Sequence, residues 1–437
     1  MKNKHLIVVS ADALVFEDLE IGKDLPVIGK MMQEGALIEK VLTIYPSLTH
    51  PVHASIMTGC PAGMTNITTN CEVQPGNLNS PWLNRLDQVE VETIFHAAHK
   101  AGLKTAACRW PLTAKGGDVI DYLVPEVMGE DMDGHEYEAP EVYRRLGTSE
   151  CVMDIVENAL SIYGSSHDHP AYDEFEIYCA AEIIRRYQPN LLLIHPGLID
   201  AERHRTGLFT EAVSESVRVT DKWLGMLLDA VRDAGIEEET DLVLLSDHGH
   251  LNVHRSICPN VLFADAGLIQ TDENGELAHW DAYAVSCGFS AQIYLSRPED
   301  EELVSAVYRL LSDTAKEKLH GFEQVFTREE VKERYGLDGN FSFVIETDGL
   351  TTFSEDWRRP VVRGLDITDY RFGHSSHGHM PEKGPQPPFL GMGPSFKKGV
   401  VLPNGNILNH APTFAKILGI ELPNAKGNVA EDILNML

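Results

Sequence analysis

Residues 6–12 read LIVVSAD, in which four apolar residues are followed within three positions by an aspartate. Similar short apolar runs recur along the chain and are predicted to be buried strands: Leu6–Val9, Lys104–Cys108, Leu191–His195, Leu242–Ser246 and Gln292–Leu295. Amphipathic stretches between them, such as Glu174–Tyr187 and Glu211–Ala234, are predicted helices. Continuous apolar strands that alternate with helices are typical of an α/β fold with a largely parallel central sheet flanked by helices.

Residues 259–372 differ in sequence pattern from the rest of the chain. Glycines divide this stretch into short segments, and two charged runs within it, Glu299–Leu311 and Arg328–Tyr335, are predicted helices. We therefore predict that residues 1–258 and 373–437 form a core domain, into which residues 259–372 are inserted as a smaller cap.

Composition narrows the class of protein. With 437 residues, of which 43% are hydrophobic and 23% charged, the chain is expected to fold rather than remain disordered. A formal net charge of −30 argues against binding a nucleic-acid polymer or an anionic membrane surface. The first apolar run is too short for a signal peptide, and seven cysteines without metal-type spacing suggest reduced thiols, so we expect a cytoplasmic protein. The oligomeric state is not indicated.

Three aspartates lie just beyond predicted strands. Asp12 follows LIVV, Asp200 follows LLLIHPGLI, and Asp247 follows LVLLS. The carboxyl ends of parallel strands gather at one edge of a sheet, where ligands bind. Three carboxylates at that edge repel one another unless a positive group lies between them. Each aspartate taken alone is better explained as a helix cap or a turn residue.

Histidines accompany these aspartates. His204 lies four residues after Asp200, on the same face of a helical turn, and His248 directly follows Asp247. A lone histidine is usually structural, but sets of Asp and His at separate strand ends suit Zn²⁺, and six such ligands would serve two ions. Further histidines near these positions are His250, His254, His374, His377 and His379.

A candidate nucleophile lies in the segment YPSLTHPVHASIMTG, residues 45–59. Ser47 and Thr49 followed by Pro51 and an apolar helical pattern indicate the start of a helix. A hydroxyl group there would lie beside exposed backbone N–H groups and the positive end of the helix dipole, which favours phosphate binding. The alternative is that Thr49 only caps the helix.

These motifs together resemble the alkaline phosphatase superfamily, and most closely its type I phosphodiesterase/nucleotide pyrophosphatase family. The matching segments occur in the family's order: the strand before Asp12, PSLTHPVHASIMTG around Thr49, residues 200–204, residues 246–249 and residues 376–378. Residues 388–399 and 410–423 also resemble the closing strand and helix of that family.

The resemblance implies two divalent metal ions, with Zn²⁺ the expected metal and Mn²⁺ an alternative. By position, one ion would be held by Asp12, Asp247 and His248 and would contact Thr49. The other ion would be held by Asp200, His204 and His377. The implied reaction is attack of Thr49 on phosphorus, followed by hydrolysis of a phospho-threonine intermediate. The implied partner is a small phosphorylated substrate, with nucleotides among the candidates.

The chain departs from the family pattern at several places, and two of these departures concern site residues. Where relatives have an asparagine that donates to phosphate, this sequence has Val52, so His50 or His53 would have to replace the donor, or the substrate differs. His379 competes with His377 for the last metal position, and we favour His377 because it occupies the His-Gly position of the motif.

Few basic residues lie near the predicted site, and this bears on the charge of the substrate. Residues 41–84 contain no Lys or Arg, and Arg203 and Arg205 are expected to point away from the metal ligands. A phosphomonoester carries one more charge than a diester, so we predict a preference for diesters unless the cap supplies a cation. The candidate donors in the cap are Arg358, Arg359 and Arg363.

We therefore predict a metal-dependent phosphodiesterase or nucleotide pyrophosphatase. The enzymatic alternative is a phosphomonoesterase or phosphonate hydrolase of the same superfamily. A sulfatase is disfavoured because Cys60 is followed by Pro61 and Ala62 rather than by the sulfatase signature, and no basic set for a phosphomutase is recognisable. A non-catalytic protein stabilised by metal is the alternative of another class.

Overall fold

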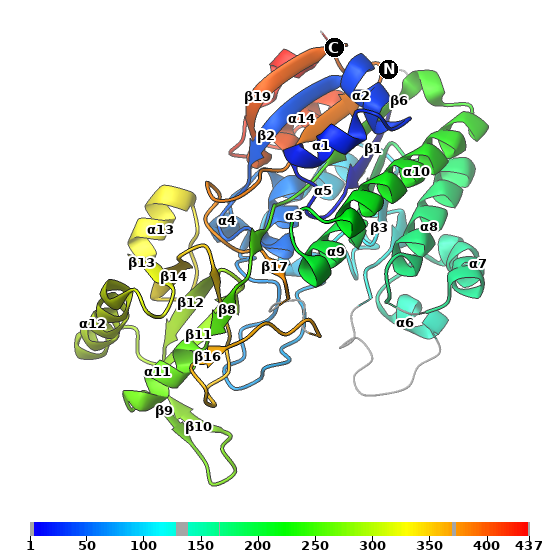
Figure 1. Ribbon diagram of the computed structural model, residues 1–437. Coiled ribbons are helices and arrows are strands. Elements are labelled where there is room, and N and C mark those ends of the chain that lie inside the picture. Colours follow the sequence, from blue (N-terminus) through cyan, green and yellow to red (C-terminus); the bar gives the residue numbers. More distant parts are fainter. Residues whose placement is uncertain (1–3, 128–138, 166, 369–372, 436–437) are drawn as a thin grey trace.

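The computed structural model describes residues 4–127, 139–165, 167–368 and 373–435. Its largest element is an eight-stranded sheet of order β19-β2-β18-β6-β1-β5-β3-β4 (Figure 1). Every neighbouring pair is parallel except those made by β18, which runs antiparallel to β2 and β6. The predicted α/β fold with a largely parallel central sheet is confirmed. The strands are β1 His5–Ser10, β2 Ala36–Leu42, β3 Thr105–Cys108, β4 Tyr122–Val124, β5 Leu191–Ile194, β6 Thr240–Leu245, β18 Phe389–Met392 and β19 Val400–Asn406.

Helices cover both faces of this sheet. Successive side chains of a strand point to opposite sides, and in these strands both sets are apolar, so each face needs its own covering layer. In β1, Ile7 and Val9 belong to one hydrophobic core, whereas Leu6 and Val8 belong to the other. The first core is completed by α2 (Ile28–Glu34), α6 (Ala139–Arg145), α7 (Met153–Tyr163), α8 (Ala171–Tyr187), α9 (Leu198–Thr206) and α10 (Glu211–Asp233). The second is completed by α3 (Thr49–Thr58), α4 (Ala62–Thr65), α5 (Ile94–Lys100) and α14 (His410–Leu418).

Four of the five predicted strands lie in the central sheet, but the fifth does not. Residues 292–295 belong to β12 (Ser290–Leu295), which pairs antiparallel with β11 (Ala282–Cys287). A two-residue turn that begins at Gly288, with φ of 72°, joins the two strands. Such a short connection permits only antiparallel pairing, so an apolar run alone did not reveal which sheet it belongs to.

The second sheet has the order β11-β12-β14-β13, with β13 at Phe322–Thr327 and β14 at Phe343–Thr347. Helices α11 (Pro259–Asp265) and α12 (Glu301–Glu317) pack on it around a separate hydrophobic core. Phe326 and Phe341 nevertheless belong to the second core of the central sheet. The division into a core and an inserted cap stays a prediction, and the predicted cap end at residue 372 lies outside the described residues. Smaller elements are α1 (Leu19–Gly22), α13 (Arg328–Tyr335), β7 (Leu251–Asn252), β8 (Arg255–Ile257), β9 (Ile269–Thr271), β10 (Leu277–Trp280), β15 (Thr351–Phe353), β16 (Val362–Arg363) and β17 (Ser375–Ser376).

Two further observations concern the chain's environment. All seven cysteines are free thiols. Within the described part of the chain, no helix combines the length and apolar character needed to cross a membrane.

Candidate active site

The site forms at the carboxyl ends of adjacent parallel strands. In the order β6-β1-β5-β3, Asp247 lies two residues beyond β6, Asp12 two residues beyond β1, and Asp200 in α9 beyond β5. The structure therefore brings together the three aspartates at the edge where the sequence pattern placed them. Two residues not proposed as site residues join the same edge, because His195 directly follows β5 and Arg109 directly follows β3.

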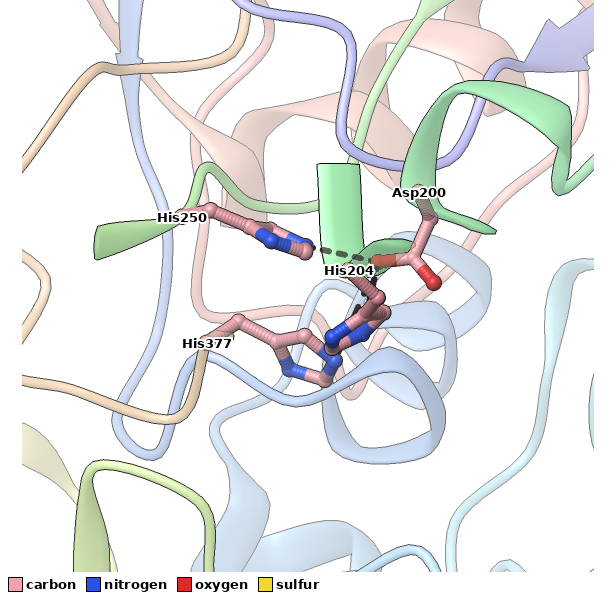
Figure 2. A group of neighbouring side chains, drawn as sticks. All are labelled: Asp200, His204, His250 and His377. Atoms are coloured by element: carbon pink, nitrogen blue, oxygen red, sulfur yellow. Dashed lines mark hydrogen bonds and ion pairs between the residues drawn. The ribbon is translucent and has the colours of Figure 1, made fainter. Parts of the chain in front are cut away.

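One group of side chains, which we call the Asp200 cluster, consists of Asp200, His204, His250 and His377 (Figure 2). Asp200 Oδ1 lies 3.4 Å from His204 Nε2, 2.7 Å from His250 Nε2 and 3.9 Å from His377 Nε2. His204 and His377 are thus placed beside Asp200 as the resemblance implied, and His250 is an unexpected fourth member.

The competing residue His379 lies elsewhere. Its Nδ1 is hydrogen-bonded to the backbone oxygen of Met380 at 2.9 Å, and its ring contacts Phe289. Of the two histidines, only His377 contributes to the Asp200 cluster.

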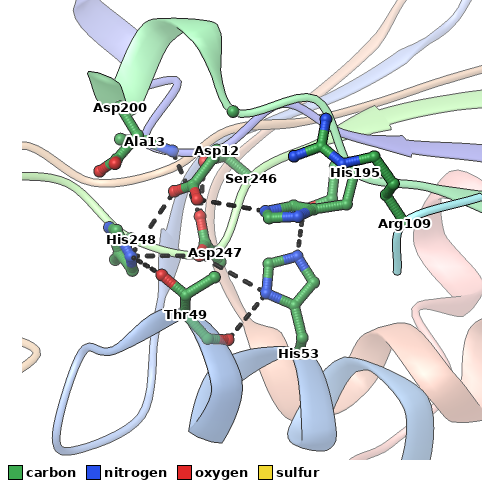
Figure 3. A network of polar contacts seen from close by, with 12 residues as sticks. Asp12, Ala13, Thr49, His53, Arg109, His195, Asp200, Ser246, Asp247 and His248 are labelled. Atoms are coloured by element: carbon green, nitrogen blue, oxygen red, sulfur yellow. Dashed lines mark hydrogen bonds and ion pairs between the residues drawn. The ribbon is translucent and has the colours of Figure 1, made fainter. Parts of the chain in front are cut away.

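A second group, the Thr49 cluster, consists of Asp12, Thr49, Asp247 and His248 (Figure 3). His248 Nε2 lies 3.2 Å from Asp247 Oδ2, 3.6 Å from Asp12 Oδ1 and 3.3 Å from Thr49 Oγ1. Ligand atoms of Asp12, Asp200 and His248 lie within 4.8 Å of one another, so Asp200 joins the two clusters. All seven residues of the predicted site are therefore neighbours.

Thr49 is the first residue of α3, and the residue that caps this helix is Leu48, which has no side-chain capping bond. The Thr49 hydroxyl instead faces His248. Its position at the amino end of a ten-residue helix places it beside backbone N–H groups that favour an anion. The alternative in which Thr49 only caps the helix is therefore not the arrangement observed.

The position of Val52 corrects one expectation from the sequence. Val52 is fully buried in the second hydrophobic core and does not line the pocket that Thr49 lines, so a donor is not missing from the pocket wall at this position. His53 does not replace such a donor either. Its Nδ1 is hydrogen-bonded to the backbone oxygen of Thr49 at 2.8 Å, and its Nε2 is hydrogen-bonded to Ser10 Oγ at 2.9 Å.

An amide that the sequence analysis missed lies closer to Thr49. Asn70 Oδ1 accepts a hydrogen bond of 3.0 Å from the backbone N–H of His50, in the first turn of α3. Asn70 lines the same pocket as Thr49. The polar run NITTN that ends at Asn70 was the only sequence signal for it.

The pocket in front of Thr49 has a volume of about 520 Å³, and Asn70, Trp82, Arg109, His195 and Asp200 contribute to its walls. Arg109 is 3% exposed. Its Nη1 donates to Glu176 Oε2 at 3.1 Å and to the backbone oxygen of Tyr172 at 3.3 Å. Its Nε is buried without a hydrogen-bond partner among the described residues.

The positive charge at the pocket comes from Arg109 and not from the arginines of the predicted cap. The three cap arginines form ion pairs within their own region, with Asp356 or Asp265, and none of them lines this pocket. Arg203 donates to the backbone oxygen of Ala13 and to Asp18, away from the clusters as expected. Arg205, in contrast, lines the pocket while paired with Glu202, which corrects the expectation that it points away.

The electrostatics of the two clusters favour cations. Burial and the neighbouring carboxylates of Asp247 and Asp200 hold the pKa of Asp12 well above its ordinary value, and burial also raises the pKa of Asp247. Burial lowers the pKa of His248 to about 3, so its imidazole is neutral. Asp12 Oδ1 and Asp247 Oδ2 are buried without a hydrogen-bond partner among the described residues. Acidic oxygens and neutral imidazoles in this arrangement are a donor set that fits divalent metal ions.

Comparisons with known proteins point to one family. Residues 6–378 match the sequence profile described as type I phosphodiesterase / nucleotide pyrophosphatase. Ectonucleotide pyrophosphatase/phosphodiesterase family member 1 of Mus musculus is 25% identical over 232 residues, which cover 52% of this chain and 21% of the mouse protein. Venom phosphodiesterase of Naja atra is 23% identical over 256 residues, covering 56% of this chain and 26% of that protein. The chain thus spans only about a fifth to a quarter of the length of these relatives.

A solved structure has the same fold. Murine ectonucleotide pyrophosphatase/phosphodiesterase 5, in an inactive threonine-to-alanine variant in complex with AMP, matches with a TM-score of 0.68 at 18% identity. The match covers 99% of this chain and 100% of the murine chain.

Proposed function

Because the chain belongs to the type I phosphodiesterase/nucleotide pyrophosphatase family, we propose that it hydrolyses a phosphodiester or nucleotide pyrophosphate bond at the Thr49 cluster. The observation that carries this proposal is the placement of the Thr49 hydroxyl at the amino end of α3, 3.3 Å from His248 Nε2 and open to the 520 Å³ pocket. A nucleotide is the substrate class we favour, in line with the AMP bound by the murine structure.

Two divalent metal ions are part of the proposal. The Thr49 cluster would hold one, and the Asp200 cluster the other, with Zn²⁺ the expected metal and Mn²⁺ an alternative. When bound, such ions supply the Lewis acidity that makes a threonine hydroxyl nucleophilic at neutral pH and they offset phosphate charge. The unpartnered oxygens of Asp12 and Asp247 support this assignment.

Thr49 is the proposed nucleophile. Its Oγ1 forms a bond to phosphorus while the bond from phosphorus to the leaving oxygen breaks, and water later cleaves the phospho-threonine to regenerate the hydroxyl. Helix α3 keeps this oxygen in place, because its residues are buried along their whole length. Asn70 is placed to donate its amide to a phosphoryl oxygen from the same wall of the pocket.

A second candidate function, hydrolysis of a phosphomonoester or phosphonate, is favoured by one observation. Arg109 brings a guanidinium group to the pocket, and its Nη2 forms no hydrogen bond with the described residues and, unlike the buried Nε, is not enclosed. This donor suits a substrate with an additional negative charge, either a monoester dianion or the second phosphate of a pyrophosphate.

The test replaces the nucleophile and measures hydrolysis of an aryl phosphodiester. Thr49→Ala removes the attacking oxygen but leaves the aspartates and histidines, so we expect kcat to fall by at least about a thousandfold, which is about 4 kcal/mol, with metal content retained. Thr49→Ser keeps the oxygen and is expected to remain active. The matched control is Thr58→Ala in the last turn of α3, whose hydroxyl donates to the backbone oxygen of Ala54 and accepts from the backbone N–H of Cys60, outside both clusters. If Thr49→Ala keeps more than about a tenth of the rate, Thr49 is not the nucleophile.

A further inference from the structure

His250 is a buried histidine that the proposed ligand sets do not use. It lies two residues beyond His248, between β6 and β7, and its ring is fully buried. Its Nε2 lies 2.7 Å from Asp200 Oδ1 (Figure 2). Whether this contact is a hydrogen bond or a pair of metal ligands depends on which ring nitrogen carries the proton.

The partner of the other ring nitrogen decides that question. His250 Nδ1 lies 3.0 Å from Ser375 Oγ, and the Ser375 hydroxyl donates its only hydrogen to the backbone oxygen of Arg203 at 2.6 Å. Ser375 Oγ can therefore only accept from His250, and His250 Nδ1 must carry a proton. In a neutral imidazole the other nitrogen, Nε2, then has a lone pair and no hydrogen.

The other two histidines of the Asp200 cluster have the same arrangement. His204 Nδ1 lies 2.7 Å from the backbone oxygen of Ser375, and His377 Nδ1 lies 3.2 Å from that of Ser47. A carbonyl oxygen only accepts, so both Nδ1 atoms donate. Three Nε2 lone pairs thus converge on one carboxylate oxygen, and donation by the second nitrogen to protein oxygens is the usual support of a metal-bound histidine.

The distances fit one tetrahedral ion. Zinc bonds of about 2.0–2.1 Å imply ligand-to-ligand separations of about 3.3–3.4 Å at the tetrahedral angle. The three Nε2 atoms lie 2.7, 3.4 and 3.9 Å from Asp200 Oδ1, on both sides of that value. Without a cation or an extra proton, the 2.7 Å contact would bring two lone pairs together, which is unfavourable.

We infer that His250 is a fourth protein ligand of the metal ion held by the Asp200 cluster, through Nε2, with Ser375 as the residue that positions its ring. This inference rests on the two-metal part of the proposed function and adds to the three ligands of the family motif. With His250, the Asp200 cluster would offer an ion four ligands that take no part in the proposed attack, whereas the Thr49 cluster would offer three and the oxygen of the nucleophile itself. The rival arrangement is a doubly protonated His250 that donates to Asp200.

The experiment reads metal–nitrogen bonds directly. The protein is labelled with ¹⁵N-histidine and loaded with ¹¹³Cd²⁺, whose nuclear spin splits the signal of a directly bonded ring nitrogen. We expect four split nitrogens, one from His248 and three from the Asp200 cluster, and the loss of one in His250→Gln. The matched control is His379→Gln, another buried histidine, which lies outside both clusters and should leave all four.

A second measurement uses zinc affinity in competition with a chelator. One of the two zinc equivalents is expected to bind at least about tenfold more weakly in His250→Gln, while the other is unchanged. Three split nitrogens in the wild-type protein, with a proton on His250 Nε2, would overturn the inference and leave the proposed function intact. No split nitrogen at all would overturn both. The number of split nitrogen signals in the wild-type protein tests whether His250 binds the metal even if the His250→Gln variant does not fold.

Discussion

Arg109 offers a sharp test of substrate preference. We consider its replacement by methionine, which has a similar length and no charge. In the wild-type protein the guanidinium uses Nη1 for Glu176 and Tyr172, and its Cζ lies 3.3 Å from the centre of the Tyr172 ring. Nη1 also lies 3.7 Å from Asp173 Oδ1, and Nη2 remains for a substrate anion. Burial already raises the pKa of Glu176 well above its ordinary value, so in the variant this carboxyl group can take up a proton and need not stay charged.

The size of the effect follows from the donors that are lost. A hydrogen bond to a charged group contributes about 1.5–3 kcal/mol, so losing one to a dianionic phosphoryl group should lower kcat/KM by about 10- to 150-fold. A diester has one negative charge fewer on its phosphoryl oxygens. We expect its kcat/KM to fall less than about threefold, because the nucleophile and the metal ligands are unchanged.

The assay compares an aryl phosphomonoester, the matching diester and a nucleotide pyrophosphate for the wild-type protein and Arg109→Met. The control is Arg109→Lys, which keeps a positive charge near Glu176 but lacks the planar set of donors and should give an intermediate loss for the monoester. Equal losses for the monoester and the diester in Arg109→Met would show that Arg109 only supports the fold around β3. That result would refute its assignment as a substrate-binding group.

Three further predictions concern metal content and pH. Exhaustive chelation should abolish activity, and Asp200→Ala should lower the metal content, measured by plasma spectrometry, from about two equivalents; full activity after chelation would contradict the two-metal proposal. His377→Ala should lose zinc whereas His379→Ala should retain it, and the opposite result would exchange their assignments. Burial raises the pKa of Glu346 to about 7 from an ordinary value of 4.5. Because the folded state then holds this proton more tightly than the unfolded state, stability is lost as the pH rises through 7, by about 3 kcal/mol in total. Buried neutral histidines such as His410 gain stability over the same pH range in both proteins, so the quantity to compare is the difference in unfolding free energy between the wild-type protein and Glu346→Gln. From urea unfolding at pH 5 and pH 8, the wild-type protein should lose about 3 kcal/mol relative to Glu346→Gln, and an unchanged difference would exclude Glu346 as the source.

Local sequence determined the fold class and much of the site. The runs before Asp12, Asp200 and Asp247 are apolar enough to be buried on both faces, and buried parallel strands place their carboxyl ends at one edge. The spacing of Asp200 and His204 on one helical turn and the hydroxyl of Thr49 at a helix start are likewise local features. These local features marked the three aspartates, their neighbouring histidines and Thr49 as candidates, whereas the choice of His377 and the division into two ligand sets came from the resemblance to the family.

The long-range packing of the chain decided the rest. The sequence of α3 does not indicate that Val52 packs in the core. All residues of this helix are buried, so it has no polar face that would distinguish the side towards the site from the side towards the core. Asn70, Arg109 and His250 lie in loops, and only the order of the strands and the folding of those loops over the sheet edge bring them to the pocket or to Asp200. A strand end is specified by its own residues, whereas the contacts between loops from distant parts of the chain depend on how the whole sheet is assembled.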